Sequence, residues 1–272
     1  MLDFLIQPFE YGFMLRALAV SVGIGVLCPM VGSYVVTRQL AFMGDALSHT
    51  VLPGLVLGYI IGVNPLLVAI PACVITAIFI GYLSKHTGLS EDTSIGIILA
   101  GLFSLGLIMI SVSGGSNIDL EGLLLGEILG VSNQDLWIIF AICIVTLGVL
   151  FFFHKELVFN SFDPEGASVI GLPSKLLDYL LLILIALVVV ASIQAVGVVL
   201  MLAMLVIPSA TAYLMARSFG FMMFLGSVIG VFVAVSGLYL SYFMDLPSGP
   251  AMTLTAVVIF IVVASFNKKL VR

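Results

Sequence analysis

The sequence predicts an all-α fold of the polytopic membrane class, and three observations support this. Of the 272 residues, 62% are hydrophobic and only 8% are Asp, Glu, Lys or Arg, whereas a soluble domain has about 25% charged residues. Several apolar runs reach about 20 residues, the length of a helix that spans a bilayer. A membrane β-barrel would instead show alternating segments of about 10 residues. The net charge of −5, with no basic run, argues against a nucleic-acid partner.

Nine apolar runs follow one another along the chain and predict a single transmembrane domain over residues 1–272. The sixth and seventh runs are separated only by a few small or polar residues within 192–197, so we expect about eight or nine membrane-spanning helices. A shorter run at 118–130 contains Glu121 and Glu127 and is too short to cross, which predicts a short external or re-entrant helix. The nine runs lie at about 12–36, 40–62, 65–84, 94–113, 136–153, 176–193, 196–216, 219–243 and 250–266.

The basic residues predict how the helices are oriented. All but one of the nine Lys and Arg residues fall in alternate connections, and Arg16 in the first run is the exception. Because Lys and Arg are enriched in cytoplasmic loops, these connections and the C-terminus are predicted to lie inside the cell and the N-terminus outside. The basic residues of the predicted cytoplasmic side are Arg38, Lys85, Lys155, Lys175, Arg217, Lys268, Lys269 and Arg272.

Two ionisable residues lie inside the second apolar run, in the stretch FMGDALSHTVLPG. If Arg38 marks the cytoplasmic interface, a rise of about 1.5 Å per residue puts Asp45 roughly 10 Å and His49 roughly 16 Å into a hydrocarbon core about 30 Å thick. Their i, i+4 spacing places both side chains on one helix face. Three interpretations are open: a hydrogen bond that joins helices, a proton relay, or a transient site for a divalent cation. We favour the cation site, because ionisable residues at this depth mark ion or proton paths.

A cation site needs more ligands than one carboxylate and one imidazole. Imidazole suits zinc, iron and other transition metals, and carboxylate suits manganese and harder ions. A two-fold dimer with this helix at its axis would supply two of each ligand, and small residues would let the two helices approach closely. Pro53 either frees a backbone carbonyl near His49 as a further ligand or only kinks the helix. The small residues are Gly44, Ala46, Ser48 and Gly54.

The longest predicted cytoplasmic connection, HKELVFNSFDPEGASVIGLPSKLLD, has the pattern of a short capped helix. Asp163 is a favourable N-cap, Pro164 follows at the first helical position, and Glu165 lies in the first turn. Gly171 and then Pro173 end the helix. A capped helix outside the membrane is suited to docking another protein, although an ordinary structured loop fits the same pattern.

Three motifs together resemble one family, over nearly the whole chain. GDALSHTVLPG, FDPEGASVIGLP and DLPSGPAMTL resemble the integral-membrane permeases of bacterial ABC importers for manganese, zinc and iron. The resemblance implies a type II ABC importer-like permease, homodimeric in the bacterial cell (inner) membrane, with a cytoplasmic ABC ATPase dimer and an extracellular or periplasmic metal-binding protein as partners. It implies that Asp45 and His49 coordinate the metal and that 159–173 is the coupling helix that docks on the ATPase. The coupling residues would be Phe162, Asp163, Pro164, Glu165, Ala167 and Gly171.

The predicted function is the transport subunit of an ATP-driven importer, with Mn²⁺ as the favoured substrate and Zn²⁺ or Fe²⁺ as alternatives. No permanently bound cofactor and no catalytic residue is expected. The sequence contains no GxxxxGK[ST] phosphate loop, so ATP hydrolysis is assigned to the partner. One rival is a proton-coupled secondary transporter that uses Asp45 and His49 as a relay. The other is a structural or sensor subunit in which the two residues only join helices.

Overall fold

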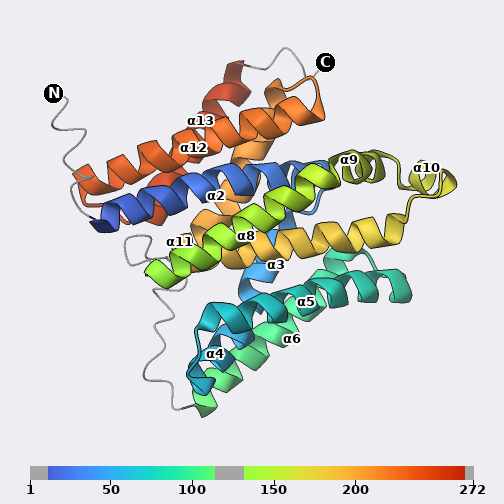
Figure 1. Cartoon of the computed structure of the whole chain (residues 1–272), viewed down its shortest axis with the longest axis horizontal. Helices are drawn as coiled ribbons and strands as arrows, with labels where there is room; N and C mark the ends of the chain where they lie inside the picture. The colour runs from blue at the N-terminus through green and yellow to red at the C-terminus, as the bar shows by residue number, and fades with distance from the viewer. Residues whose placement is uncertain (1–11, 114–131, 267–272) are drawn as a thin grey trace. The chain divides into compact units, whose positions relative to one another are not determined.

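The computed structural model describes residues 12–113 and 132–266, and within these ranges it contains helices and no strands (Figure 1). In the same ranges, nine segments are long and apolar enough to cross a membrane. They follow the nine predicted runs to within a few residues at each end. The predicted helix at 118–130, with Glu121 and Glu127, lies outside the described residues. The nine segments are Gly12–Thr37, Ala41–Ile61, Pro65–Thr87, Glu91–Val112, Asn133–Phe152, Ser174–Ile193, Val196–Met215, Phe219–Met244 and Ser248–Phe266.

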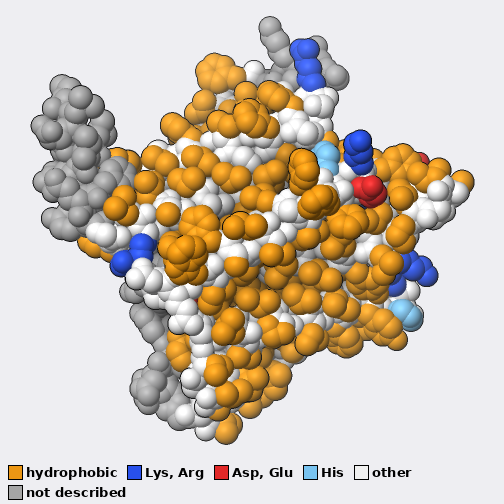
Figure 2. Space-filling view, viewed as in Figure 1, with side chains coloured by type: hydrophobic (Ala, Val, Ile, Leu, Met, Phe, Trp, Pro, Cys, Tyr) orange, Lys and Arg blue, Asp and Glu red, His pale blue; other side chains and the backbone are white. Residues whose placement is uncertain are grey.

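The outer faces of the long helices are hydrophobic, as contact with lipid requires. Figure 2 shows hydrophobic side chains over most of the visible surface, with few charged side chains among them. On α8 (Asn133–Phe152), Trp137 is 73% exposed and Phe151 is 81% exposed. Soluble monomers rarely expose such large apolar areas, so this surface fits a bilayer and not water.

Contacts between helices divide the chain into two compact units. The first contains α2 (Gly12–Thr37) as far as Val36, the beginning of α8, the later part of α11 (Ser174–Met215), α12 (Phe219–Met244) and α13 (Ser248–Phe266). The second contains residues 37–113 and 145–191. The candidate site residues predicted from the sequence all belong to the second unit.

The first unit is packed through small residues. Gly25 of α2 lies against Gly230 of α12, where a Cβ on Gly230 would overlap the carbonyl oxygen of Gly25. Such close backbone approach is how membrane helices gain packing energy without a hydrophobic driving force. Within α11, Gly197 has φ +76°, which interrupts the helix between the sixth and seventh spans. The interruption falls in the 192–197 segment where the sequence predicts a separation.

The second unit is built from short and long helices around the second crossing. That crossing is divided, because α3 ends at Thr50 and α4 begins at Leu52 with Pro53 in its first turn. Pro53 has no N–H and cannot continue the hydrogen-bond ladder, which accounts for the break, although Val51 between the two helices keeps helical φ and ψ. Both α3 and α4 pack against α5 and α6. The helices of this unit are α3 (Ala41–Thr50), α4 (Leu52–Ile61), α5 (Pro65–Thr87), α6 (Glu91–Val112), the later part of α8, α9 (His154–Phe162), α10 (Pro164–Val169) and the first part of α11.

Local capping fixes where the long helices of this unit begin. The side chain of Asn64 accepts a hydrogen bond from the N–H of Leu66 (2.9 Å), and Pro65 opens α5. The hydroxyl of Ser90 accepts one from the N–H of Thr93 (3.2 Å) at the start of α6. Each cap satisfies a backbone donor that would otherwise lack a partner. The first residues of α5 and α6 are therefore determined by their own local sequence.

Candidate functional site

Asp45 and His49 lie on the one face of α3 that stays open. Their side chains are 33% and 29% exposed, respectively, and Phe42 on the same side is 44% exposed. The remaining residues of this short helix are mostly buried. The i, i+4 spacing therefore has the predicted effect, and both side chains lie on the same partly exposed side of α3.

The two side chains are close without being hydrogen-bonded. Nε2 of His49 lies 3.8 Å from Oδ1 of Asp45, beyond the 2.7–3.2 Å that is typical of a hydrogen bond. A metal ion placed between them at about 2.1 Å from each atom would fit this separation. The contact lies within a single helix, so it does not support the interpretation in which the pair only joins two helices.

The ring of His49 is oriented by a neighbour on α6. The ring of Phe103 meets it edge-to-face, with centroids 5.4 Å apart and planes at 74°. On the backbone, the hydroxyl of Ser48 donates to the carbonyl oxygen of Asp45 (2.6 Å). The imidazole of His49 thus lies against the ring of Phe103, and the carboxylate of Asp45 is partly exposed on the same side of α3.

The pair is incomplete as a metal centre. Over residues 12–113 and 132–266, no group of three or more His, Cys, Asp or Glu side chains is placed to hold a metal ion. Structural zinc takes four ligands and manganese prefers six oxygen-rich ligands. Within the described residues, Asp45 and His49 are therefore not joined by a third His, Cys, Asp or Glu ligand.

The small residues around the pair do not lie where the sequence predicts. We expected Gly44, Ala46, Ser48 and Gly54 to let two copies of this helix approach each other. All four are buried, and Gly54 lies against Ala69 and Ala72 of α5. That expectation is wrong, because these residues pack within the chain and the open face has the ligand pair and Phe42 instead.

The predicted capped helix is present as α10. Oδ1 of Asp163 accepts a hydrogen bond from the N–H of Gly166 (2.8 Å), and Pro164 is the first helical residue. The helix ends before Gly171, which has φ +86°. The segment 159–173 is therefore the end of α9, the cap, α10 and a turn. It is not one continuous helix.

The predicted coupling residues divide into an exposed set and a buried anchor. Phe162 is 64% exposed, and Asp163, Pro164, Glu165 and Gly171 are exposed as well. Ala167 is fully buried and fixes the inner side of α10. Two further apolar side chains at the end of this helix, Val169 and Ile170, are 85% and 65% exposed, which leaves an apolar surface outside the membrane spans.

Residues 10–267 match the model of the ABC 3 transport family. The chain belongs to this family. It is 38% identical to the manganese transport system membrane protein MntC of Halalkalibacterium halodurans, over 97% of this chain and 90% of that one. It is 38% identical to the manganese import system permease protein ScaB of Streptococcus gordonii (96% and 93% covered). It is 37% identical to the chelated iron transport system membrane protein YfeD of Yersinia pestis (96% and 88% covered).

Solved structures agree with this assignment. PsaBC from Streptococcus pneumoniae, in complex with a Fab, superposes with a TM-score of 0.86 at 36% identity, over 96% of this chain and 94% of that one. An inward-facing metal-chelate type ABC transporter shares the fold, with a TM-score of 0.73 at 16% identity. The chain is thus an ABC-type permease, a multi-pass membrane protein of a transport system.

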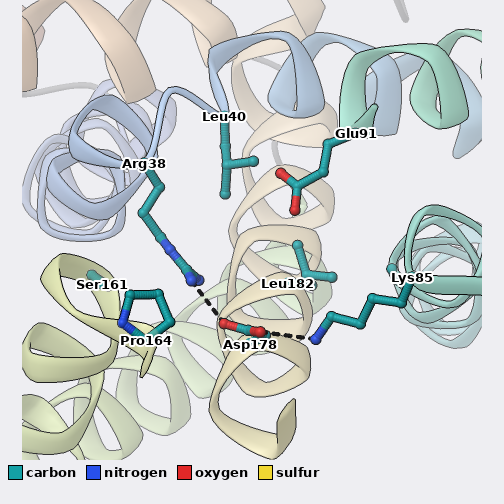
Figure 3. A pocket seen from close by; sticks show the side chains of 9 residues that line it. Arg38, Leu40, Lys85, Glu91, Ser161, Pro164, Asp178 and Leu182 are labelled. Atoms are coloured by element: carbon teal, nitrogen blue, oxygen red, sulfur yellow. Dashed lines mark hydrogen bonds and ion pairs between the residues drawn. The ribbon is translucent and has the colours of Figure 1, made fainter. Parts of the chain in front are cut away.

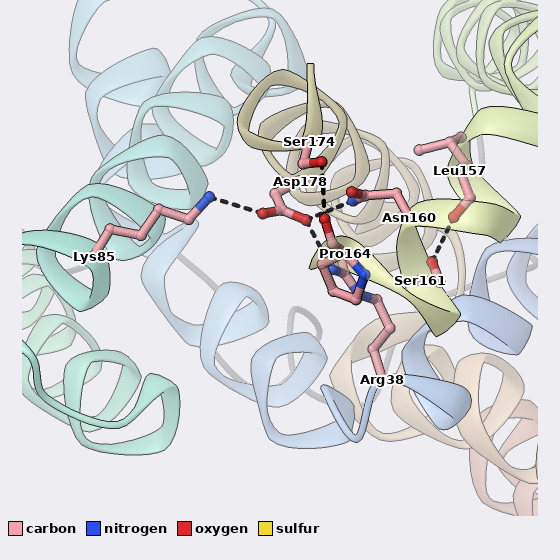
Figure 4. A network of polar contacts seen from close by, with 8 residues as sticks. All are labelled: Arg38, Lys85, Leu157, Asn160, Ser161, Pro164, Ser174 and Asp178. Carbon is pink, nitrogen blue, oxygen red and sulfur yellow. Dashed lines mark hydrogen bonds and ion pairs between the residues drawn. The ribbon is translucent and has the colours of Figure 1, made fainter. Parts of the chain in front are cut away.

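Sequence reasoning missed one cluster in this ABC 3 family permease, the Asp178 cluster, which consists of Arg38, Lys85, Asn160 and Asp178. Oδ1 of Asp178 accepts from Arg38 Nη2 (2.7 Å) and from Asn160 Nδ2 (2.9 Å), and Oδ2 accepts from Lys85 Nζ (2.8 Å) (Figure 4). The available signal was an acidic residue just inside the sixth apolar run, on the same predicted side as Arg38 and Lys85.

A cavity of about 270 Å³ lies beside this cluster (Figure 3). Arg38, Lys85 and Asp178 form its polar wall together with Glu91, the first residue of α6. Leu182 of α11 adds an apolar wall. The charged ends of several helices in this unit therefore meet around one space, at the end that the basic residues predict to be cytoplasmic.

Proposed function

We propose that this chain is the membrane-spanning subunit of an ATP-driven importer that moves a divalent transition metal, with Mn²⁺ as the substrate. The observation on which the proposal rests is the Asp45–His49 pair on the open face of α3. One carboxylate and one imidazole, 3.8 Å apart, combine a hard and a borderline ligand of the kind that Mn²⁺, Fe²⁺ and Zn²⁺ accept. Manganese is favoured because the relatives MntC and ScaB are named for manganese transport, whereas YfeD is named for chelated iron.

The site is completed by a second copy of the chain. Each chain offers two ligands at an opening, and a two-fold axis beside α3 would double them to two carboxylates and two imidazoles. A partly exposed pair suits this role, because a ligand buried inside one chain would not reach a partner. Phe42 on the same face would then lie at the contact between the copies.

Energy comes from a separate cytoplasmic ATPase that docks on α10. The exposed Phe162, Val169 and Ile170 supply apolar contact area there, and Glu165 supplies a charge. The rigid cap at Asp163 holds this surface in one conformation, which lowers the entropy that docking would otherwise cost.

Transport then follows an alternating-access cycle. A metal-binding protein outside the cell releases the ion, and the ion is held between the two copies by Asp45 and His49 of each. ATP-driven movement at α10 opens the inner side. The ligation has to be weak enough for release, since conduction requires a site that the ion can leave.

The direct test is metal accumulation in cells that express Asp45→Ala or His49→Ala. Each substitution removes half of the ligands of the completed site, so accumulation of radioactive Mn²⁺ is expected to fall to the level of cells without the permease. The matched control is Asp92→Asn, which removes an exposed acid from the first turn of α6 and is expected to leave uptake unchanged. Wild-type uptake in either ligand variant at normal expression would overturn the metal site. Uptake that persists after ATP depletion and stops when the proton gradient is dissipated would favour the proton-coupled rival.

A further inference from the structure

The carboxylate of Asp178 connects segments that come from distant parts of the second unit. Arg38 belongs to the link before α3, Lys85 to the last turn of α5, and Asn160 to α9. Figure 4 shows these side chains converging on Asp178 from separate segments. Both carboxylate oxygens accept hydrogen bonds, so a single side chain fixes the separation of the segments.

One of these segments leads directly to the ligand pair. Arg38 is followed by Gln39, which has φ +59°, and α3 begins at Ala41. Asp45 therefore lies only seven residues beyond Arg38, with one non-helical link between them. A shift of the Arg38 backbone would move the start of α3 and the ligands on it.

Another segment leads directly to α10. Asn160 lies in the last turn of α9, three residues before the cap residue Asp163. On the other side of α10, the hydroxyl of Ser174 donates to the carbonyl oxygen of Pro164 (3.2 Å), four residues before Asp178 on α11. Both helices that flank α10 therefore connect it to Asp178.

Charge-assisted hydrogen bonds hold the Asp178 cluster together, and a cavity adjoins it. Charge-assisted hydrogen bonds are about twice as strong as neutral ones, and the side chain of Asp178 is only 23% exposed, which limits the solvent screening that weakens surface ion pairs. The adjoining cavity of about 270 Å³ gives Arg38 and Lys85 space for a second arrangement (Figure 3).

We propose that Asp178 is a positioning residue that couples movement of the α9–α10 segment to α3 and its Asp45–His49 pair. This inference rests on the proposed transport function. Asp178 touches neither the ion nor the ATPase in this proposal. Its carboxylate acts through Arg38 on one side and through Asn160 on the other. The competing view is that the cluster is a static anchor that only holds the helix ends together.

The test compares transport with ATP hydrolysis in the complex of the permease with the ATPase that copurifies with it, reconstituted in proteoliposomes. The substitution Asp178→Asn keeps the size of the side chain and removes its charge. We expect ATP hydrolysis to be largely retained and the number of Mn²⁺ ions imported per ATP to fall by about two- to thirtyfold, the range of coupling changes that single residues cause. Binding of Mn²⁺ to the purified permease should be unchanged, because Asp45 and His49 are intact.

Three further variants make the result specific. Glu91→Gln removes a negative charge from the wall of the same cavity. Because Glu91 has no ion pair within the described part of the chain, the ratio of Mn²⁺ imported to ATP hydrolysed should not change. Asn160→Ala breaks only the link to α9 and should lower the ratio with both ion pairs intact. Asp178→Glu keeps the charge and should restore part of the ratio lost in Asp178→Asn.

The outcomes separate this inference from the proposed function. An unchanged ratio in Asp178→Asn, or equal losses of transport and ATP hydrolysis, would mean a static anchor and would overturn the inference. If Asp178→Asn fails to fold, the ratio in Asn160→Ala decides in the same way. If the wild-type permease copurifies with no ATPase, or binds Mn²⁺ no better than Asp45→Ala does, the proposed function itself fails.

Discussion

At the scale of single residues, the aromatic contact on His49 is the feature that sets how the imidazole is presented. An edge-to-face pair with Phe103 stabilises one ring orientation by about 0.5–1.5 kcal/mol. Residues that orient a metal ligand without binding the metal also influence its affinity. If His49 binds the ion as proposed, Phe103 would influence how tightly the ion is held, although it offers no ligand atom.

We expect Phe103→Ala to raise the Mn²⁺ concentration at half-maximal uptake by about two- to tenfold, because the imidazole loses its preferred orientation. The maximal rate should change little, since both ligands remain. Initial rates of uptake at a series of Mn²⁺ concentrations measure both quantities. Phe79→Ala, which removes an exposed ring from α5, is the control. An unchanged half-maximal concentration in Phe103→Ala would show that the ring contact does not tune the site.

The residues found from the sequence and those missed differ in the range of their interactions. Asp45 and His49 could be proposed as a pair because helical spacing brings near neighbours onto one face. Asp178 was missed because its partners lie 140 and 93 positions away along the chain, and no local pattern encodes such pairing. Gly54 was misread for the same reason, since packing against α5 decides whether a small residue faces a neighbour of its own chain or another copy.

At the scale of elements, α10 is a helix whose formation depends on its cap. A helix of six residues is too short to be stable by propensity alone. The bond from the N–H of Gly166 to Asp163 and the preset backbone of Pro164 supply local stabilisation instead. Because these determinants are local, α10 could be predicted from the sequence, including its first residue.

Loss of the cap should therefore loosen the proposed docking surface. Asp163→Ala is expected to cost about 1 kcal/mol of helix stability, which corresponds to about a fivefold weaker hold on the ATPase if docking requires the folded helix. Asp163→Asn retains a capping oxygen and should behave nearly as wild type. The measurement is the amount of ATPase that copurifies with each variant. Equal yields of ATPase from the Ala and Asn variants would show that docking does not depend on the Asp163 cap.

At the scale of the whole molecule, the proposed metal site would be completed by a second chain that meets the first at the exposed face of α3. Phe42 is exposed on that face, and the three native cysteines, Cys28, Cys73 and Cys143, are buried. A cysteine placed at position 42 would thus be an accessible thiol beside the proposed two-fold axis.

We expect Phe42→Cys to give covalent dimers with a short bifunctional maleimide in membranes, because two copies of position 42 would lie near each other. Ile75→Cys, at a 65% exposed position on α5, is the matched control and should give few. Gel mobility under denaturing conditions measures the yield. Equal yields at the two positions would contradict an axis beside α3.

The nine spans themselves were predictable, since apolar length alone marks them. Their pairing was not, because every membrane helix is apolar over most of its surface and therefore has no strong preference for one neighbour. In this chain the preference comes from backbone contacts such as Gly25 with Gly230 and from polar clusters at helix ends.

The break at Val51 separates α3, which contains the proposed ligands, from α4, which follows it in the same crossing. Asp45 and His49 both precede it, on α3, so bending at the Pro53 joint leaves the 3.8 Å gap between their ligand atoms untouched. Such a bend would change only the angle between α4 and α3. In the proposed cycle, the spacing of the ligands and the direction of α4 could therefore change independently, within a single crossing of the membrane.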